Sequence, residues 1–597
     1  MIHHNVFFRH LSLCALACQG LFAGPDFSDL LSETTDVSLI VRDISSLNQQ
    51  LEAHPFQEFL ESEAVTQLMD FFRTENAVDE ESFLDVAESR FGLSGEDLLE
   101  LFPGQLSISM DSVVAMMDGE LERPDLLIMA ETTADEARMQ SLMKIQFEHN
   151  AEAQKAHNPA VEHRIIERSF MGETLYLDET FNGELTYIED AYALVDGIFL
   201  LASPVERLEA AVESIKEGND TPMSRGNGFL RASELSEGPD VRFMIQINDL
   251  LAPVKTKLAN LEGGGSAMAM MGMTPDSFWN ALGLDALQSY WMDFNLVEDG
   301  AVMYSGLNYT EKKGLLSLLA YTEGPLPEAG FVPEDAVMAS VAGFSLSELF
   351  RQFEIMLSQA SPNLGQMMNL QLLNLQSKIG VDLRAGLLNN FGDQSIAFSV
   401  LGDSPDGEQA LRNMASVYVF DVPDTGLMGQ AIDGLLAMAP QIKPMLTEEL
   451  FAGEKIFSFA GMPNPNLPEA QTSFHYTLTR SQLVVSSGPV HVLKSTLTEL
   501  QTPSRDGGFW ARDDIVDLVD RLELDQSVGT VAYDLSAMDG AALAYLEMIQ
   551  HSMPGVAKEK RMPEGTSLEM PFLAAYGIEQ GDGLLFMKAI MIGKDSE

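Results

Sequence analysis

Alternating side chains and tight turns predict an antiparallel sheet. Residues 241–248 alternate with a period of two, with Val, Phe and Ile on one side of the strand and Arg242 on the other. Asp196-Gly197 separates two apolar runs and predicts a two-residue hairpin. The segments 298–300 and 581–583 carry similar turn signals. Hairpins in this number, with helices between them, predict an α+β fold rather than a doubly wound one.

Helix signals follow several of the predicted strands. Apolar runs at 37–41 and 337–341 predict strands, and each precedes a serine, Ser45 or Ser345, that can cap the next helix. The clearest helix has a 3.6-residue period on one face: Val205, Leu208, Val212 and Ile215. Its expected start combines an N-cap serine, a proline in the first position and a capping-box glutamate: Ser203, Pro204 and Glu206.

The sequence also repeats itself, with a period of about 285 residues. Three pairs of segments keep the same order: 221–229 with 502–509, 172–176 with 453–457, and 203–205 with 488–490. Residues 323–330 have the composition of a linker. We therefore predict two similar α+β units, 37–322 and 331–597, each an antiparallel sheet with helices packed on it.

The N-terminus predicts export. Residues 1–23 resemble a secretory signal peptide, and cleavage near Ala23 would leave a short segment, 24–36, before the first unit. Alternatively, Ala15–Cys18 resembles a lipobox, in which Cys18 would be acylated and become the mature N-terminus. Both cysteines of the chain lie in this leader, and no later run of 18 apolar residues predicts a transmembrane segment. The expected location is the periplasm or the cell surface of a bacterium.

Charge excludes one class of partner. The chain has 90 acidic and 35 basic residues, a formal net charge of −55 with histidine neutral. This surplus of carboxylates would repel polyphosphate, so a nucleic-acid partner is not expected. Hydrophobic residues make up 46% of the chain, which is enough for a folded core.

Two sets of residues have metal-binding chemistry without a decisive spacing. One is a group of histidines in an acidic stretch: His149, His157 and His163. Their spacing does not place two imidazoles on one helical face, so a solvated helix end is expected there. The other is a methionine group that could hold Cu(I): Met268, Met270, Met271 and Met273. Because methionine also fills irregular cores, we predict no metal or cofactor.

No catalytic motif is evident. G-x-S-x-G, the S-x-x-K and K-T-G pair, and an EF-hand loop do not occur in the sequence. Arg225 and Arg505, in the repeated T-P element, could hold a carboxylate. The structural interpretation of that element is favoured, because its threonine, proline and glycine set turns that dock Phe229 and Phe509 into the core.

Together these motifs carry a resemblance to a known family. The strand at 36–41 followed by S-S-L, the block 192–208 and the T-P…G-F element resemble a domain-of-unknown-function family of exported bacterial proteins of planctomycete, verrucomicrobial and cyanobacterial types. The resemblance covers most of the first unit and, more loosely, the second, where Asp196-Gly197 becomes Ser481-Gln482. It implies secretion and a duplicated body, but no activity or site residue.

Three functions stay open at this point. The first is a non-catalytic envelope protein, binding or structural, that presents an acidic surface to an unknown exported partner. The second is a carrier of an apolar, lipid-like ligand, since 33 Phe and 33 Met could line a cavity of ~300 Å³ or more between sheet and helices. The third is an unrecognised periplasmic enzyme, which would need acids and a base around a polar cleft.

Overall fold

A computed structural model describes most of the chain after the predicted leader. The described residues are 25–52, 54–60, 62, 65, 91–117, 125–157, 159–181, 185–260, 271–404, 406–439, 443–463, 471–502, 507–524, 526–538, 540–542, 569–581 and 583–594. The leader with Cys18, and also Met268, Met270 and Arg505, lie outside these ranges.

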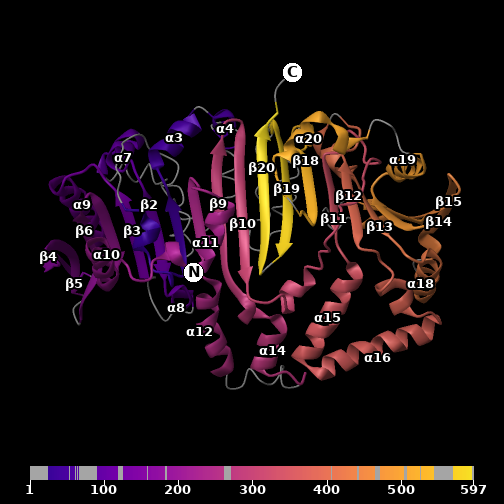
Figure 1. Ribbon diagram of the computed structural model, residues 1–597, viewed down its shortest axis with the longest axis horizontal. Coiled ribbons are helices and arrows are strands. Elements are labelled where there is room, and N and C mark those ends of the chain that lie inside the picture. The colour runs from indigo at the N-terminus through magenta and orange to yellow at the C-terminus, as the bar shows by residue number, and fades with distance from the viewer. Residues whose placement is uncertain are drawn as a thin grey trace.

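The strands form one antiparallel sheet, which confirms the α+β class (Figure 1). From its outer edge to the centre, the first half contributes β4 (Glu162–Phe170), β5 (Glu173–Phe181), β6 (Thr186–Val195), β7 (Ile198–Ser203), β3 (Asp125–Glu131), β2 (Leu106–Asp111), β1 (Val37–Val41), β8 (Val241–Ile245), β9 (Leu287–Val297) and β10 (Gly300–Tyr309). In the same direction, the second half contributes β14 (Leu446–Phe451), β15 (Glu454–Pro463), β16 (Gln471–Leu478), β17 (Gln482–Ser487), β13 (Ala415–Asp421), β12 (Gln394–Val400), β11 (Met338–Gly343), β18 (Gly529–Asp534), β19 (Phe572–Gly581) and β20 (Leu584–Gly593).

The described helices connect these strands. In the first half they are α2 (Phe27–Leu30), α3 (Ile44–Glu52), α4 (Pro55–Leu60), α7 (Gly95–Leu101), α8 (Val113–Met117), α9 (Glu136–His157), α10 (Val205–Glu217), α11 (Asn227–Leu235), α12 (Ile247–Asn260) and α14 (Pro275–Leu282). In the second half they are α15 (Leu346–Ala360), α16 (Pro362–Ile379), α17 (Gly407–Arg412), α18 (Thr425–Met438), α19 (Val490–Gln501) and α20 (Asp513–Asp520). Within the described ranges, no helix is both long and apolar enough to cross a bilayer.

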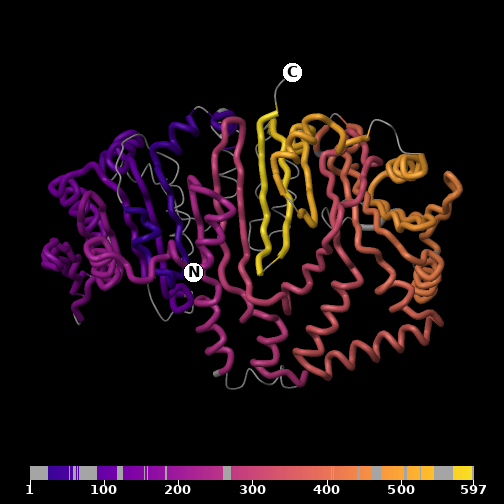
Figure 2. The backbone as a smooth tube through the Cα atoms, in the orientation of Figure 1, coloured from indigo at the N-terminus to yellow at the C-terminus, as the bar shows by residue number. Residues whose placement is uncertain are grey.

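The two halves pair their strands in the same order and meet at their last strands. β10 and β20 run antiparallel, with Tyr304 opposite Lys588 at the middle of the ladder. Figure 2 shows these two segments, far apart in the sequence, side by side at the centre of the molecule. Val302 of β10 packs in the core of the second half, and Phe586 of β20 packs in that of the first. The two predicted units therefore share one sheet and a common core boundary.

Several local predictions are confirmed. The Asp196-Gly197 hairpin joins β6 to β7, with φ of 51° and 82° at the two turn residues. The predicted helix is α10, and its predicted face is turned inward, although it begins at Val205 and Pro204 is its N-cap residue rather than its first helical residue. Ser345 caps α15, because its side chain accepts a hydrogen bond from the Glu348 N–H.

Two predicted caps are wrong. Ser45 lies inside the first turn of α3 and is buried, and the Asp43 carboxylate accepts the Ser46 N–H instead, at 2.8 Å. Ser203 does not cap α10; its hydroxyl donates to the backbone carbonyl oxygen of Glu189 at 2.9 Å. At α3 a carboxylate takes the capping role that the spacing predicts for the serine, and at α10 the serine hydroxyl bonds to the backbone of another strand instead.

The strand predicted at 241–248 is found as β8 over Val241–Ile245 only, because Ile247 and Asn248 begin α12. Its more buried face carries Arg242 and Met244 rather than the predicted Val241, Phe243 and Ile245. The Arg242 guanidinium donates from Nε and Nη2 to the two carboxylate oxygens of Asp293, at 2.8 and 2.6 Å. It also donates to the Ser233 hydroxyl at 2.7 Å and lies 4.4 Å from the ring centre of Phe229. A paired charge with satisfied donors can occupy a core position that the alternation assigned to the surface.

A candidate metal centre

The structure separates the three histidines of the acidic stretch. His149 is exposed on α9, and His157 is the last residue of that helix. His163 lies on β4, and only 7% of its side chain is exposed. His149 is solvated as expected, but on the face of a helix rather than at its end, and the expectation is wrong for His163.

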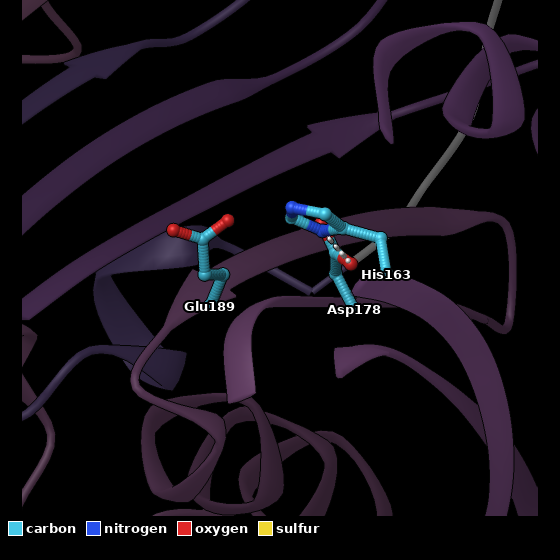
Figure 3. Close-up of side chains that lie close together, drawn as sticks. All are labelled: His163, Asp178 and Glu189. Carbon is cyan, nitrogen blue, oxygen red and sulfur yellow. Dashed lines mark hydrogen bonds and ion pairs between the residues drawn. The ribbon is translucent and has the colours of Figure 1, made fainter. Parts of the chain in front are cut away.

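His163 belongs to a buried group on three neighbouring strands. Asp178 of β5 and Glu189 of β6 join it, and one ligand atom from each residue lies within 4.8 Å of the other two. The Nδ1 atom of His163 is 3.1 Å from Asp178 Oδ1. Figure 3 shows the imidazole between the two carboxylates. Because Asp178 is 1% exposed and Glu189 6%, both carboxylates are removed from solvent.

Strand register brings these residues together. The β4–β5 ladder places His163 directly opposite Thr180, so that Asp178 is its diagonal neighbour on the same face. The β5–β6 ladder has a bulge between Leu177 and Glu179. A bulge adds one residue to a strand and redirects the side chain there. Glu189 and Asp190 of β6 stand here against Asp178 alone, so the extra residue lies on the strand that carries Glu189.

Two hydroxyl groups contact the site. The Ser203 hydroxyl donates to the backbone carbonyl oxygen of Glu189 and so orients the strand that carries this residue. The buried Thr180 hydroxyl lies 2.9 Å from His163 Nδ1, the nitrogen that faces Asp178, and would give up this contact if Nδ1 bound an ion.

The donor set suits a divalent transition metal ion. Zinc takes imidazole nitrogen at 2.0–2.1 Å and carboxylate oxygen at about 2.0–2.2 Å, so two ligands of a tetrahedral site lie about 3.4 Å apart. The 3.1 Å between His163 Nδ1 and Asp178 Oδ1 is close to that spacing. Imidazole favours Zn²⁺ and other transition metals, whereas Mg²⁺ and Ca²⁺ prefer oxygen alone.

The second half of the chain offers an internal comparison. Tyr176 stacks on Tyr192 with ring centres 4.8 Å apart, and Phe457 stacks on Tyr476 at 4.9 Å in the corresponding ladder. These aromatic pairs and the glycine turns before them align the two halves. In this alignment His163 corresponds to Pro444, Asp178 to Phe459 and Glu189 to Ser473. The corresponding strands of the second half therefore pair in the same order without ionisable side chains at these positions.

The other candidate residues lie elsewhere. Arg225 is exposed at the end of the short 3-10 helix η3 (Met223–Arg225). Met271 is 49% exposed in a turn, and Met273 precedes α14. Phe509 is fully buried, as the structural interpretation of the T-P element predicts.

A second polar hollow lies beside the start of β1. It has a volume of 240 Å³, and Asp36, Asp249 and Lys257 are among its lining residues. Burial raises the pKa of the Asp36 carboxyl, and neighbouring Asp111 adds to the effect. Burial also raises the pKa of Asp249. These carboxylates form hydrogen bonds within the fold, such as that from the Val113 N–H to Asp36, and have no histidine among the lining residues.

Comparisons with known proteins give little guidance. No family model and no curated protein matches the chain. Among solved structures, the chain is similar to crystal form IV of TP0453 at 6% identity, covering 48% of this chain and 81% of that one, with a TM-score of 0.23. Crystal form III of TP0453 matches at 8% identity over 51% and 90% of the two chains, again with a TM-score of 0.23. Similarity at these TM-scores supports no argument about function.

Proposed function

We propose that this chain is an exported, non-catalytic protein of the bacterial envelope that binds a divalent transition metal ion through His163, Asp178 and Glu189. The observation that carries the proposal is the burial of one imidazole and two carboxylates within 4.8 Å of one another. Burying two carboxylates side by side is costly unless a cation compensates them. A metal ion would supply that charge and link β4, β5 and β6.

A protonated imidazole could supply the charge instead. In that arrangement His163 would hold both carboxylates by hydrogen bonds, and the site would be structural. A metal ion is favoured because a tetrahedral ion would bind all three side chains together. The two arrangements differ in one measurable respect, since only the first takes up metal.

Export and internal duplication are part of the same proposal. The leader at 1–23 and the resemblance to exported bacterial proteins support export, with cleavage near Ala23 or acylation of Cys18 as the two possible maturations. The equal pairing order of the two halves supports duplication. Mass spectrometry of the native N-terminus tests export, because an intact Met1 would contradict it.

The apolar-ligand carrier has less support. The largest fully buried side chains include Met129, Met223 and Met244, which pack in the core of the first half. Methionine in these positions acts as core filler. Lipid that co-purifies with the chain in native mass spectrometry would favour the carrier over the metal protein.

Metal titration is the direct test. The chain from residue 24, stripped of metal with a chelator, should bind one Zn²⁺ in isothermal titration calorimetry. His163→Ala and Glu189→Gln should lose this binding, because each removes one ligand. His149→Ala is the matched control, since it removes an exposed histidine of the same stretch and should keep the site. Equal binding by His163→Ala and the wild type would contradict the proposal.

A further inference from the structure

A hollow adjoins the candidate metal centre. It has a volume of 380 Å³ and lies between one face of α9 and the strands β4 and β5. His163 and Asp178 are among its lining residues, whereas Glu189 approaches the imidazole from β6 (Figure 3). An ion held by all three side chains would therefore border the hollow on the side of His163 and Asp178.

Coordination chemistry leaves room for another ligand. Three protein ligands do not complete a tetrahedral shell, and zinc sites with three protein ligands keep the fourth position for water or substrate. The volume of the hollow falls in the range of small-molecule sites, about 300–1,000 Å³. Its inner wall includes buried apolar side chains of α9, Phe147 and Ala151. The hollow can thus hold a small organic or inorganic molecule next to the ion.

The charges around the hollow favour an anion. Three cations line it: Lys144, Lys155 and Arg164. A divalent ion would offset the charges of Asp178 and Glu189, which leaves Glu148 and Glu152 as the acids of the lining. Lys144 lies 3.8 Å from Glu148, but both side chains are 65% exposed, and an ion pair in that position is weak. Lys144 can therefore turn to an incoming anion together with Lys155, in a lining close to neutral on a chain with 90 acids and 35 bases.

We infer that a small oxyanion, a carboxylate or a phosphate, enters this hollow and coordinates the bound metal. Lys144 and Lys155 on α9 hold its charge from the rim, while Arg164 is already paired with Glu179. Charge-assisted hydrogen bonds to carboxylate and phosphate are the strong ones, and lysine provides them as a mobile point charge. The inference rests on the proposed metal centre and adds the class of its ligand.

Cobalt substitution tests metal binding and anion binding separately. Co²⁺ takes the same ligands as Zn²⁺ and its visible absorption reports the coordination shell. The chain is loaded with one equivalent of Co²⁺ and titrated in parallel with phosphate, acetate and, at matched ionic strength, chloride. We expect phosphate or acetate to change the spectrum at saturating concentration while chloride leaves it unchanged. The anion with the lower half-saturation identifies which oxyanion chemistry the hollow prefers.

Variants locate the effect in the hollow. Lys144→Ala/Lys155→Ala should raise the half-saturation concentration of the anion three- to tenfold, without loss of Co²⁺. Lys455→Ala, an exposed lysine on β15 of the other half, is the matched control and should leave the titration unchanged. Absorption that no oxyanion alters, or equal titrations by the double variant and the wild type, would overturn the inference and leave the metal centre standing. A wild-type chain that acquires no Co²⁺ spectrum would overturn both.

Discussion

The buried pair of Arg242 and Asp293 offers a quantitative test of how this sheet tolerates charge. Arg242 is 4% exposed and Asp293 is fully buried. Burial raises the pKa of the Asp293 carboxyl above its usual value, even though the hydrogen bonds from Arg242 lower it. In Arg242→Met the carboxylate would keep its burial and lose its cation.

Removing one partner of such a pair should cost about 3–5 kcal/mol of the free energy of unfolding, because an uncompensated charge stays in the core. Replacing both partners should cost far less. Arg242→Met/Asp293→Leu leaves only the Ser233 hydroxyl and the Ser236 carbonyl oxygen without their donor, at about 1 kcal/mol each. At the corresponding ladder position in the second half, an uncharged pair, Thr530 opposite Gly577, takes the place of the ion pair.

Urea unfolding followed by circular dichroism measures the two single variants and the double variant. Two single variants at about 3–5 kcal/mol each, against about 2 kcal/mol for the double variant, give an expected coupling of about 4–8 kcal/mol for the pair. Arg164→Met is the matched control: Arg164 is 71% exposed and pairs with Glu179, so its loss should stay within about 1 kcal/mol.

The pH dependence of Arg242→Met has a defined sign. Without Arg242, the folded-state pKa of Asp293 rises further, so the native state binds a proton more tightly than the unfolded state. The penalty is then fully present above the folded-state pKa and decreases as the pH falls through it. The variant should lose less stability at pH 5 than at pH 8. A loss below about 1 kcal/mol at pH 8, equal to that of the control, would refute the reasoning.

Three further predictions concern helix capping, the cooperativity of unfolding and the burial of an acidic side chain. Ser345→Ala should cost about 1 kcal/mol of unfolding free energy, because it removes the cap of α15. Ser45→Ala should cost almost nothing, since no described residue hydrogen-bonds the Ser45 hydroxyl. Equal losses in urea unfolding would contradict both expectations. Single-tryptophan variants that retain Trp291 in the first half or Trp510 in the second should report the same urea midpoint, because the halves share one sheet, and separate midpoints would refute this. Asp249→Asn should raise the urea midpoint at pH 7, because burial raises the pKa of that carboxyl and disfavours its charged form. The gain should vanish at low pH, where the wild-type carboxyl is protonated. A gain that persists at low pH would show that the charge of Asp249 is not its cause.

Local patterns predicted elements better than they predicted partners. The Asp196-Gly197 turn and the helix after Pro204 depend on residues adjacent in sequence, and both are found as expected. The face of β8 could not be predicted in the same way. The burial of Arg242 depends on Asp293, 51 residues later and on a different strand. Alternation shows that a strand has two faces, but only the neighbouring strand shows which charges each face can accept.

The candidate metal site illustrates the same limit more strongly. Motif searches look for ligands on one helical face or close together in a loop, and His163 is 15 residues from Asp178, which is in turn on a different strand from Glu189. What unites them is the register of two ladders and one bulge. Comparison with the second half is not a sufficient signal, because the pair of Arg242 and Asp293 is replaced there as well, by Thr530 opposite Gly577. What sets the candidate site apart is an imidazole buried with two carboxylates, and it is the pairing of β4, β5 and β6 that brings these three side chains together.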